Sequence, residues 1–422
     1  MKFKSLIIFL LLIVPGQYLL AQWVPHPVEN YGIYDFLDEL ANARIIDINS
    51  AIKPYSRMFI AEKLKEAGEK TESLNPRQVR ELEFYMRDFG KEFDNGTGAQ
   101  WFKGVTEERG TSDPEPGTLN KRPDLFYYKD SLFSLTVNPI LGGEVFTNSA
   151  GRATYWRNGV EARAYIGKWG FFASLRDNHE KPLLGKPEYL TRRPGGHIKG
   201  STDWSEMRGG VTYAWKWGSA GMVKDGFQWG SNYNGANIFG GNTPSFIQVR
   251  LQLTPVKWFT FNYFHGWLNS MVIDSAKSYW VTNSYGTDYR EFYHSKYISA
   301  NMYTFTPMKN LNISAGNSII YDNQKVNPAF LMPLFFYKSV DHSVTSGIDN
   351  MNSQMFFDIS SRQIKNLHLY ATLFVDELSV KRFTMDNEWN FFSWKGGFRL
   401  SNFPVSNLSL TTEFTYTYPL SF

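Results

Sequence analysis

A short turn flanked by alternating strands recurs four times in the second half of the chain. Before the first copy, Thr254-Pro255-Val256-Lys257, apolar residues occupy every second position between residues 246 and 253, and aromatic residues alternate with polar ones between 259 and 263. Alternation with a period of two predicts a β-strand on each side of the turn. The other copies begin at Thr306, Arg362 and Phe403. The pattern therefore predicts a series of β-hairpins.

The stretch between one turn and the next holds a strand that leaves the turn, a long polar segment rich in Gly, Asn, Asp and Tyr, and a strand that returns. Each hairpin thus has a short turn at one end and a long loop at the other. Transmembrane β-barrels have this asymmetry, with short periplasmic turns and long extracellular loops. A soluble β-propeller blade also repeats at roughly 40 to 50 residues, so the period alone leaves both architectures open.

The N-terminus favours the membrane architecture because it carries an export signal. Lys2 and Lys4 precede an apolar run at residues 6–14, and the small residue Ala21 ends the segment. This predicts a secretory signal peptide at residues 1–21, since the apolar run is shorter than the roughly 20 residues that a membrane-spanning helix requires. The chain has no cysteine, which excludes disulfides and a lipid-modified cysteine.

The composition agrees with a barrel and argues against one class of partner. Aromatic residues make up 17% of the chain, whereas the four charged residue types together make up only 20%. Barrels carry aromatic rings at both membrane interfaces, and sugar-binding surfaces also use them. The net charge is only +4, without a block of like charges, so nothing indicates nucleic-acid binding.

Between Ile33 and about Asn95 the apolar period becomes helical. The pattern predicts three helices, of which the first begins near Ile33, the second is capped by Ser56, and the third opens with Asn75-Pro76. Residues 22–100 are therefore expected to form a periplasmic helical domain that lies below or inside the barrel. Residues 101–122 are rich in Gly, Thr, Ser, Pro and Asp and are expected to form a linker.

Residues 123–422 are predicted to form the barrel. Thirteen segments have strand character, near residues 132–146, 153–167, 169–178, 207–217, 218–226, 246–254, 258–270, 293–306, 309–321, 349–361, 365–377, 390–400 and 405–418. Single-chain bacterial barrels close with an even number of strands, so either one strand has no clear pattern or the chain continues beyond Phe422. The terminal Phe after an alternating aromatic strand favours the first alternative. The expected fold class is an all-β transmembrane antiparallel β-barrel of about 14–18 strands with a small N-terminal α-helical domain.

Several segments resemble the capsule assembly protein Wzi family of outer-membrane proteins. They are the helical start at residues 34–64, the segments 226–230 and 237–250, and the motifs at 340–342 and 347–350 that lead to Asp358. The resemblance covers most of the chain after the signal peptide. It implies a barrel of about eighteen strands with a helical bundle at the periplasmic end. It also implies a role at the outer surface in holding capsular polysaccharide on the cell.

The sequence contains no recognisable catalytic or metal-binding motif. Its seven histidines never pair at a metal-ligand spacing, and neither a G-x-S-x-G elbow nor a phosphate-binding glycine loop is present. We therefore expect neither an enzyme nor a cofactor, although a barrel esterase could still assemble Ser, His and an acid from separate strands. His368 alternates with Leu367 and Leu369 and is predicted to face the lumen.

The long loops are the expected place for ligand-binding residues. The loop at residues 179–206 contains Arg192, Arg193 and Trp204, and Trp229 and Tyr233 follow in the next loop. Guanidinium groups bind carboxylates and flat rings stack on sugar faces, so this set suits an acidic polysaccharide. The alternative is that the two arginines are a solvated pair, Trp204 anchors the membrane interface, and Trp229 only packs its loop.

The function predicted from these patterns is surface attachment or assembly of capsular polysaccharide by an outer-membrane protein. The alternatives are a porin or channel for small solutes, and a structural component of an outer-membrane secretion or motility apparatus. The expected partners are a surface polysaccharide and outer-membrane lipids. The repeated short turns are expected to face the periplasm, with the long loops outside.

Overall fold

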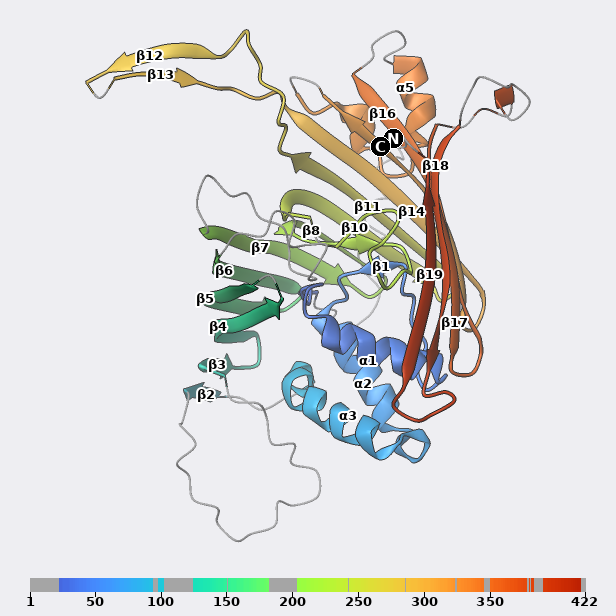
Figure 1. Ribbon diagram of the computed structural model, residues 1–422. Helices are drawn as coiled ribbons and strands as arrows, with labels where there is room; N and C mark the ends of the chain where they lie inside the picture. Colours follow the sequence, from blue (N-terminus) through green and yellow to red (C-terminus); the bar gives the residue numbers. More distant parts are fainter. Residues whose placement is uncertain are drawn as a thin grey trace, which may run out of the picture.

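The computed structural model describes residues 23–93, 98–101, 124–149, 151–181, 203–241, 243–284, 286–322, 325–344, 350–377, 379, 381–382 and 390–418 (Figure 1). A curved antiparallel sheet forms one side of the molecule, and a helical unit lies in its concave side. The predicted signal peptide and most of the predicted linker lie outside the described residues.

The helical unit, which we call the plug, comprises residues 23–93. Its helices are α1 (Tyr31–Asn42), α2 (Arg57–Gly68) and α3 (Pro76–Phe89), with short 3-10 turns η1 (Thr71–Ser73) and η2 (Gly90–Glu92). The Ser56 hydroxyl accepts a hydrogen bond from the Phe59 N–H at 3.1 Å, and Asn75 and Gln78 form a capping box with Pro76 in the first turn. The three predicted helices and their start signals are confirmed.

The apolar core of the plug is built from its own residues. The buried members of this core all lie between Ile33 and Phe89, and they include Phe36, Leu37 and Leu64. No residue of the large sheet belongs to this cluster within the described part of the chain. The plug is therefore a unit with its own core, which docks on the sheet through other contacts.

The large sheet, which we call the wall, contains fifteen strands in the described residues. Its order is β19-β18-β17-β16-β15-β14-β11-β10-β8-β7-β6-β5-β4-β3-β2, and all neighbours that pair do so antiparallel. The strands are β2 (Gly98–Trp101), β3 (Phe126–Lys129), β4 (Phe133–Asn148), β5 (Gly151–Ile166), β6 (Trp169–Lys181), β7 (Asp203–Trp215), β8 (Gly218–Asp225), β10 (Phe246–Val256), β11 (Phe259–Leu268), β14 (Lys296–Met308), β15 (Leu311–Tyr321), β16 (Met351–Ile364), β17 (Leu367–Glu377), β18 (Phe391–Ser401) and β19 (Ser409–Thr417). No ladder joins β19 to β2 within these ranges.

Thirteen of these strands coincide with the thirteen predicted segments. The two additional ones, β2 and β3, have four residues each, which is too short for an alternating pattern to stand out. Because β2 pairs with β3, the wall already begins at Gly98, before the predicted start of the barrel at residue 123. The number of strands lies within the predicted range of 14–18.

The remaining elements are short. Strand β1 (Ile52–Lys53) of the plug pairs with β9 (Gln228–Trp229), and β12 (Tyr279–Asn283) pairs with β13 (Gly286–Arg290) in a hairpin that projects from the wall in Figure 1. The 3-10 helix η3 (Pro328–Leu331) and helix α5 (Tyr337–Val344) lie in the connection between β15 and β16.

The repeated turns all lie at one end of the wall, as the hairpin pattern predicts. Asn310 and Asn366 turn the corner between paired strands with positive φ angles of 64° and 65°, a conformation that Asn tolerates better than most residues. Pro255 and Pro307 fall within the strand ends, where the register shifts between Leu253 and Val256 and between Phe305 and Met308. The prolines therefore occupy β-bulges, in which their missing N–H removes no regular ladder bond.

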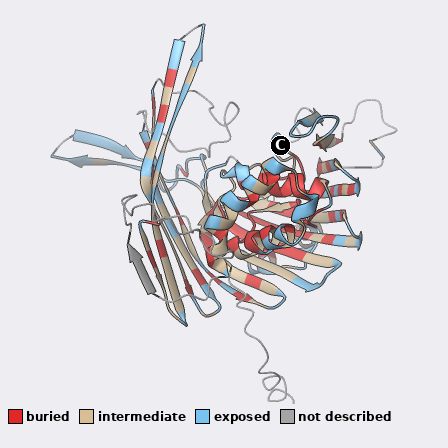
Figure 2. Ribbon diagram, turned by 90° about the horizontal axis from the view of Figure 1, so that it is seen from below, coloured by how far each residue is buried: buried red, intermediate tan, exposed pale blue. Residues whose placement is uncertain are grey.

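The wall buries polar residues and exposes apolar ones, the reverse of a soluble sheet. Strand β16 shows this clearly, because Asp358, Ser360 and Arg362 are buried whereas Phe357 and Ile359, which alternate with them, are 48% and 43% exposed. Strand β17 repeats the pattern, whereas on β14 the outward-facing Ser299 and Asn301 are buried under the connection that contains η3 and α5. Figure 2 shows the helices within the concave face. An apolar outer face and a polar inner face characterise a transmembrane barrel. The predicted fold class is confirmed.

Aromatic residues mark two levels on the outer face. Trp169, Trp217 and Trp258 lie at the short turns with 47%, 49% and 57% of their surface exposed, and Trp156 lies on the same face nearer the loop end. Trp156 pairs with His179, ten residues along β6 from Trp169, which is roughly 34 Å of extended strand. A tilt of about 45° reduces this length to roughly 24 Å, close to the apolar band of an outer-membrane barrel. Among the described residues, the helices are all too short or too polar to cross a membrane.

Candidate functional site

The interface between plug and wall is lined by ion pairs. Arginines from five strands face carboxylates of the plug, and the pairs are Arg163 with Asp88, Arg176 and Arg208 with Glu29, Arg362 with Asp38, and Arg399 with Asp35. The wall supplies the cation and the plug supplies the anion in each of these pairs. The docking of the plug therefore depends strongly on electrostatic contacts.

Glu29 connects the segment before α1 to two neighbouring strands. Its carboxylate accepts a hydrogen bond from Arg176 at 2.6 Å and further hydrogen bonds from Arg208, and all three side chains are nearly inaccessible to solvent. Burial alone would raise the pKa of Glu29, but the two guanidinium groups outweigh it and hold the pKa well below its usual range. Glu29 is thus charged at neutral pH, and its removal would leave two buried cations without this partner.

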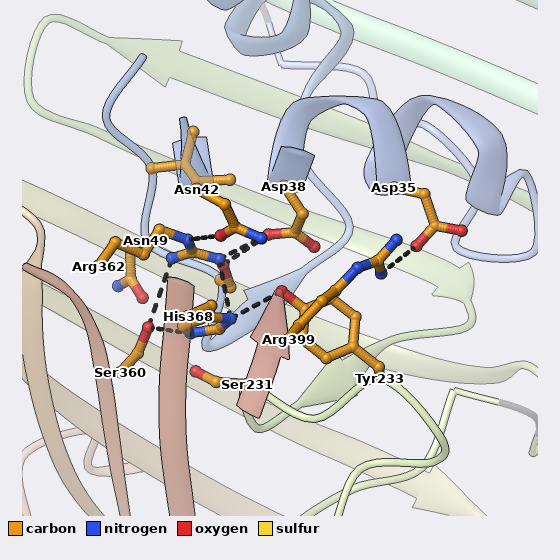
Figure 3. Close-up of polar contacts among 12 residues, drawn as sticks. Asp35, Asp38, Asn42, Asn49, Ser231, Tyr233, Ser360, Arg362, His368 and Arg399 are labelled. Carbon is orange, nitrogen blue, oxygen red and sulfur yellow. Dashed lines mark hydrogen bonds and ion pairs between the residues drawn. The ribbon is translucent and has the colours of Figure 1, made fainter. Parts of the chain in front are cut away.

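On the side of the plug opposite Glu29, Arg362 of β16 is the centre of the contacts with the wall. Its guanidinium donates to Asp38 at 2.7 Å, to the Asn42 side-chain oxygen at 2.7 Å and to the Ser50 hydroxyl at 2.6 Å (Figure 3). Arg362 is 1% exposed and Asp38 is 2% exposed, so the pair is shielded from water. Burial alone would raise the pKa of Asp38, but Lys53 and Arg362 outweigh it and lower that pKa.

The same region binds the C-terminal end of α1. The Asn366 N–H, in the turn between β16 and β17, donates to the Asn42 carbonyl at 2.6 Å, and the Asn42 side chain donates to the Ser401 hydroxyl at 3.0 Å. A terminal helix carbonyl otherwise lacks an intrahelical partner. The repeated turns of the wall therefore also serve as docking points for the plug.

A second inward element is the segment Gly226–Ser245, which we call the inward loop. It crosses the interior, where Ser231 donates to Asp358 through both its N–H (2.9 Å) and its hydroxyl (2.8 Å). The Tyr233 and Asn234 N–H groups donate to Glu413 at 2.8 and 3.0 Å. The loop is thus fixed to β16 and β19, far from it in sequence, and it occupies part of the lumen next to the plug.

Three of the five residues predicted to bind a ligand lie in the described part of the chain, and all three contact other protein groups. Trp204 is only 7% exposed and stacks on Tyr155 with ring centroids 6.2 Å apart. Trp229 is 3% exposed and packs against Phe227, Phe239, Phe264 and Phe356. Trp204 thus belongs to strand β7, not to a loop, and its substitution is expected to disturb packing. Arg192 and Arg193 lie outside the described residues.

Tyr233 lies in the interior of the barrel, at the centre of a hydrogen-bonded chain. Its hydroxyl is 2.7 Å from His368 Nδ1, and the Ser360 hydroxyl is 2.7 Å from His368 Nε2. The Arg399 guanidinium stacks on the Tyr233 ring at 4.5 Å from its centroid and pairs with Asp35 at 3.1 Å. His368 therefore faces the interior, as its alternation with two leucines predicts.

The pair of Ser360 and His368 resembles the first two members of a hydrolase triad, but its surroundings differ. Both residues have no exposed surface, the third partner is the Tyr233 hydroxyl instead of a carboxylate, and Arg362 lies 3.4 Å from His368 Nδ1. A triad requires an accessible nucleophile and an acid that orients the histidine. The pair therefore acts as a structural link between strands and inward loop. No group of three or more potential metal ligands occurs among the described residues.

A cavity of about 590 Å³ separates the plug from β4–β7. Arg157, Arg163 and Arg176 line it from the wall, whereas Tyr31 and Phe84 line it from the plug. The volume lies in the usual range for small-molecule sites. Sequence analysis did not identify these residues, although the odd-numbered positions of β5 place Arg157, Glu161 and Arg163 on one face with the buried Tyr155 and Tyr165.

Comparisons with known proteins add little to this description. No protein-family description and no curated protein matches the chain. The solved structures with limited similarity include the NanC porin, which is 11% identical, with a TM-score of 0.22; the match covers 67% of this chain and 99% of the NanC chain. They also include Pseudomonas aeruginosa OccK9 (OpdG), which is 10% identical, with a TM-score of 0.21; the match covers 68% of this chain and 94% of the OccK9 chain. At these scores the fold class rests on strand pairing and burial alone.

Proposed function

We propose that this protein is an outer-membrane channel for small polar or charged solutes, closed by its own plug. The observation that carries the proposal is the contrast between the two kinds of contact made by the plug. Its apolar core is internal, whereas ion pairs and hydrogen bonds form much of its contact with the wall. Polar interfaces within one chain commonly permit relative motion. A displaced plug would leave a lumen lined by polar residues.

The cavity beside β4–β7 indicates the side on which passage would begin. Here about 590 Å³ of space lies beside the Glu29 ion pairs, and a second space of about 490 Å³ lies between the plug and the short-turn ends of β7–β15. Arg362 and the inward loop fill the opposite side. Displacement of the Glu29 segment would widen the first of these spaces. We therefore place the passage along the inner face of β4–β7.

The test is single-channel recording in planar bilayers with the full chain and with a variant that lacks residues 31–89. We expect small or rare conductance steps from the full chain and large, persistent steps from the deletion variant. Insertion of both proteins is checked by their heat-modifiable migration on gels. Equal conductance from two well-inserted proteins would contradict the proposal.

Surface attachment of polysaccharide is the second candidate, and the β12–β13 hairpin is the observation that favours it. This hairpin projects at the end of the wall that carries the long loops (Figure 1). Tyr279 and Trp280 are 52% and 69% exposed, and Phe292 just beyond β13 is 44% exposed. Exposed aromatic rings stack on sugar faces. The resemblance to the Wzi family, noted in the sequence, points to the same candidate function.

A further inference from the structure

The cavity between plug and wall is lined by arginines and carboxylates, which include Glu29, Asp88 and Glu161, and aromatic rings lie on its plug side. Arg157, Arg163 and Arg176 line its wall side, and Tyr31 and Phe84 line its plug side. We propose that this cavity binds an acidic saccharide of one to three sugar units, with its carboxylates on the arginines and its rings against the aromatic side chains. The inference deepens the proposed channel function by naming a solute class.

The arginines retain unused hydrogen-bonding capacity. Arg176 is 6% exposed and uses one terminal nitrogen on Glu29, while its Nε and its other terminal nitrogen have no protein partner. The Nε of Arg157 also lacks a hydrogen-bond partner, and one terminal nitrogen of Arg163 has only its ion pair with Asp88 at 3.8 Å. Buried N–H groups without acceptors are costly, and a carboxylate satisfies two of them at once. These nitrogens have almost no accessible surface, so an anionic ligand would reach them after the guanidinium groups turn towards the cavity.

Strand register sets the length of this basic row. Arg176 lies opposite Gly159, so along the strands it lies between Arg157 and Arg163. These two arginines are six positions apart on one strand, a separation of roughly 20 Å. A single small anion would engage only part of the row, whereas a short acidic saccharide could engage more than one guanidinium. The cavity volume fits a ligand of that size.

Gly142 on the neighbouring strand supports the placement of Arg157. A Cβ atom at this position would lie 2.7 Å from Arg157 Nε, so a larger residue would displace the guanidinium. On the other side of the cavity, Tyr31 is 51% exposed and Phe84 is 56% exposed. Guanidinium groups facing flat rings across one cavity suit a ligand with both carboxylates and sugar faces.

The binding test uses the purified full chain in detergent and isothermal titration calorimetry. The probe is α-1,4-digalacturonate, and maltose serves as the uncharged disaccharide of matching linkage. We expect digalacturonate to bind in a salt-sensitive manner and maltose not to bind. Absence of digalacturonate binding, or equal binding of maltose, would overturn the proposal. Since no passage is measured, this result is independent of the conductance test of the channel function.

Four variants locate the site. Arg157→Gln should weaken digalacturonate binding about ten- to a hundredfold, the usual effect of losing a hydrogen bond to a charged group. Gly142→Ala should weaken it without changing any charge, and Phe84→Ala should weaken it with little salt dependence. Arg152→Gln on the same strand is the matched control, because Arg152 is exposed and does not line the cavity, so binding should be unchanged. Wild-type affinity in both Arg157→Gln and Phe84→Ala would overturn the assignment.

Discussion

Replacement of Arg362 by alanine should release α1 from the wall without unfolding the barrel. The substitution removes a guanidinium with 1% exposure that binds Asp38, Asn42 and Ser50. Breaking a buried ion pair by removing one partner costs about 3–5 kcal/mol. Lys53 lies 3.6 Å from Asp38 and continues to compensate its charge, so we expect the lower end of that range. Docking should therefore weaken by about 3 kcal/mol, roughly a hundredfold in the equilibrium between docked and released plug.

The assay is hydrogen–deuterium exchange of the α1 amides in the inserted protein. Exchange through release of the plug should accelerate by about the same hundredfold factor, whereas wall amides should keep their rates because the substitution leaves the strand ladders intact. Arg87→Ala is the matched control, since Arg87 is an exposed arginine on α3. If Arg362→Ala leaves α1 exchange at the control level in a well-inserted barrel, the ion pairs do not hold the plug.

Four further predictions concern the remaining parts of the molecule. Glu29→Gln should increase conductance, because Arg176 and Arg208 lose a charged partner, and planar-bilayer recordings would show no change if this clamp is unimportant. Burial, with a contribution from Arg57, lowers the pKa of His26 to about 3, so the unfolded chain binds more protons than the folded chain between pH 6.5 and 3. The free energy of unfolding should therefore fall by up to about 5 kcal/mol as pH falls through that window. His26→Phe should lessen this fall in acid-denaturation curves, and an unaltered pH dependence would refute the reasoning. Cysteine at Ser339 should react with an impermeant thiol reagent on intact cells and cysteine at Lys309 should not, and the reverse pattern would invert the barrel. Trp280→Ala should reduce the cell-bound fraction of capsular polysaccharide if the hairpin holds it, whereas unchanged retention would remove the main structural support for the second candidate function.

The period of the apolar pattern predicted most of the fold because strands and helices are determined largely by residues close together in sequence. Alternation located the thirteen longer strands, and capping residues such as Ser56 and Asn75 located the starts of two helices. Strands β2 and β3 were missed because four residues contain too few alternations. The bulges at Pro255 and Pro307 extended strands into segments that the sequence analysis assigned to turns.

The interface between plug and wall could not be predicted in the same way, since its partners are far apart in sequence. Arg362 illustrates the difficulty, because the sequence analysis placed it at the start of a turn, whereas it is the last buried residue of β16 and meets Asp38. Its position two residues after Ser360 and four after Asp358 assigns it to the inner face, so alternation contained a usable signal. The carboxylate that it binds depends on how the plug docks, which no local pattern determines.

The most direct test of the account is to lock the plug in place with a disulfide. The chain has no cysteine, and the Asn42 side chain donates to the Ser401 hydroxyl at 3.0 Å across the interface, so cysteines at both positions would face each other in the docked state. We predict that the oxidised protein is closed in planar bilayers and that reduction of the same molecules restores conductance steps, with single-cysteine variants insensitive to reduction. Equal conductance in the oxidised and reduced states, with the disulfide confirmed by mass spectrometry, would contradict the claim that movement of the plug opens the barrel.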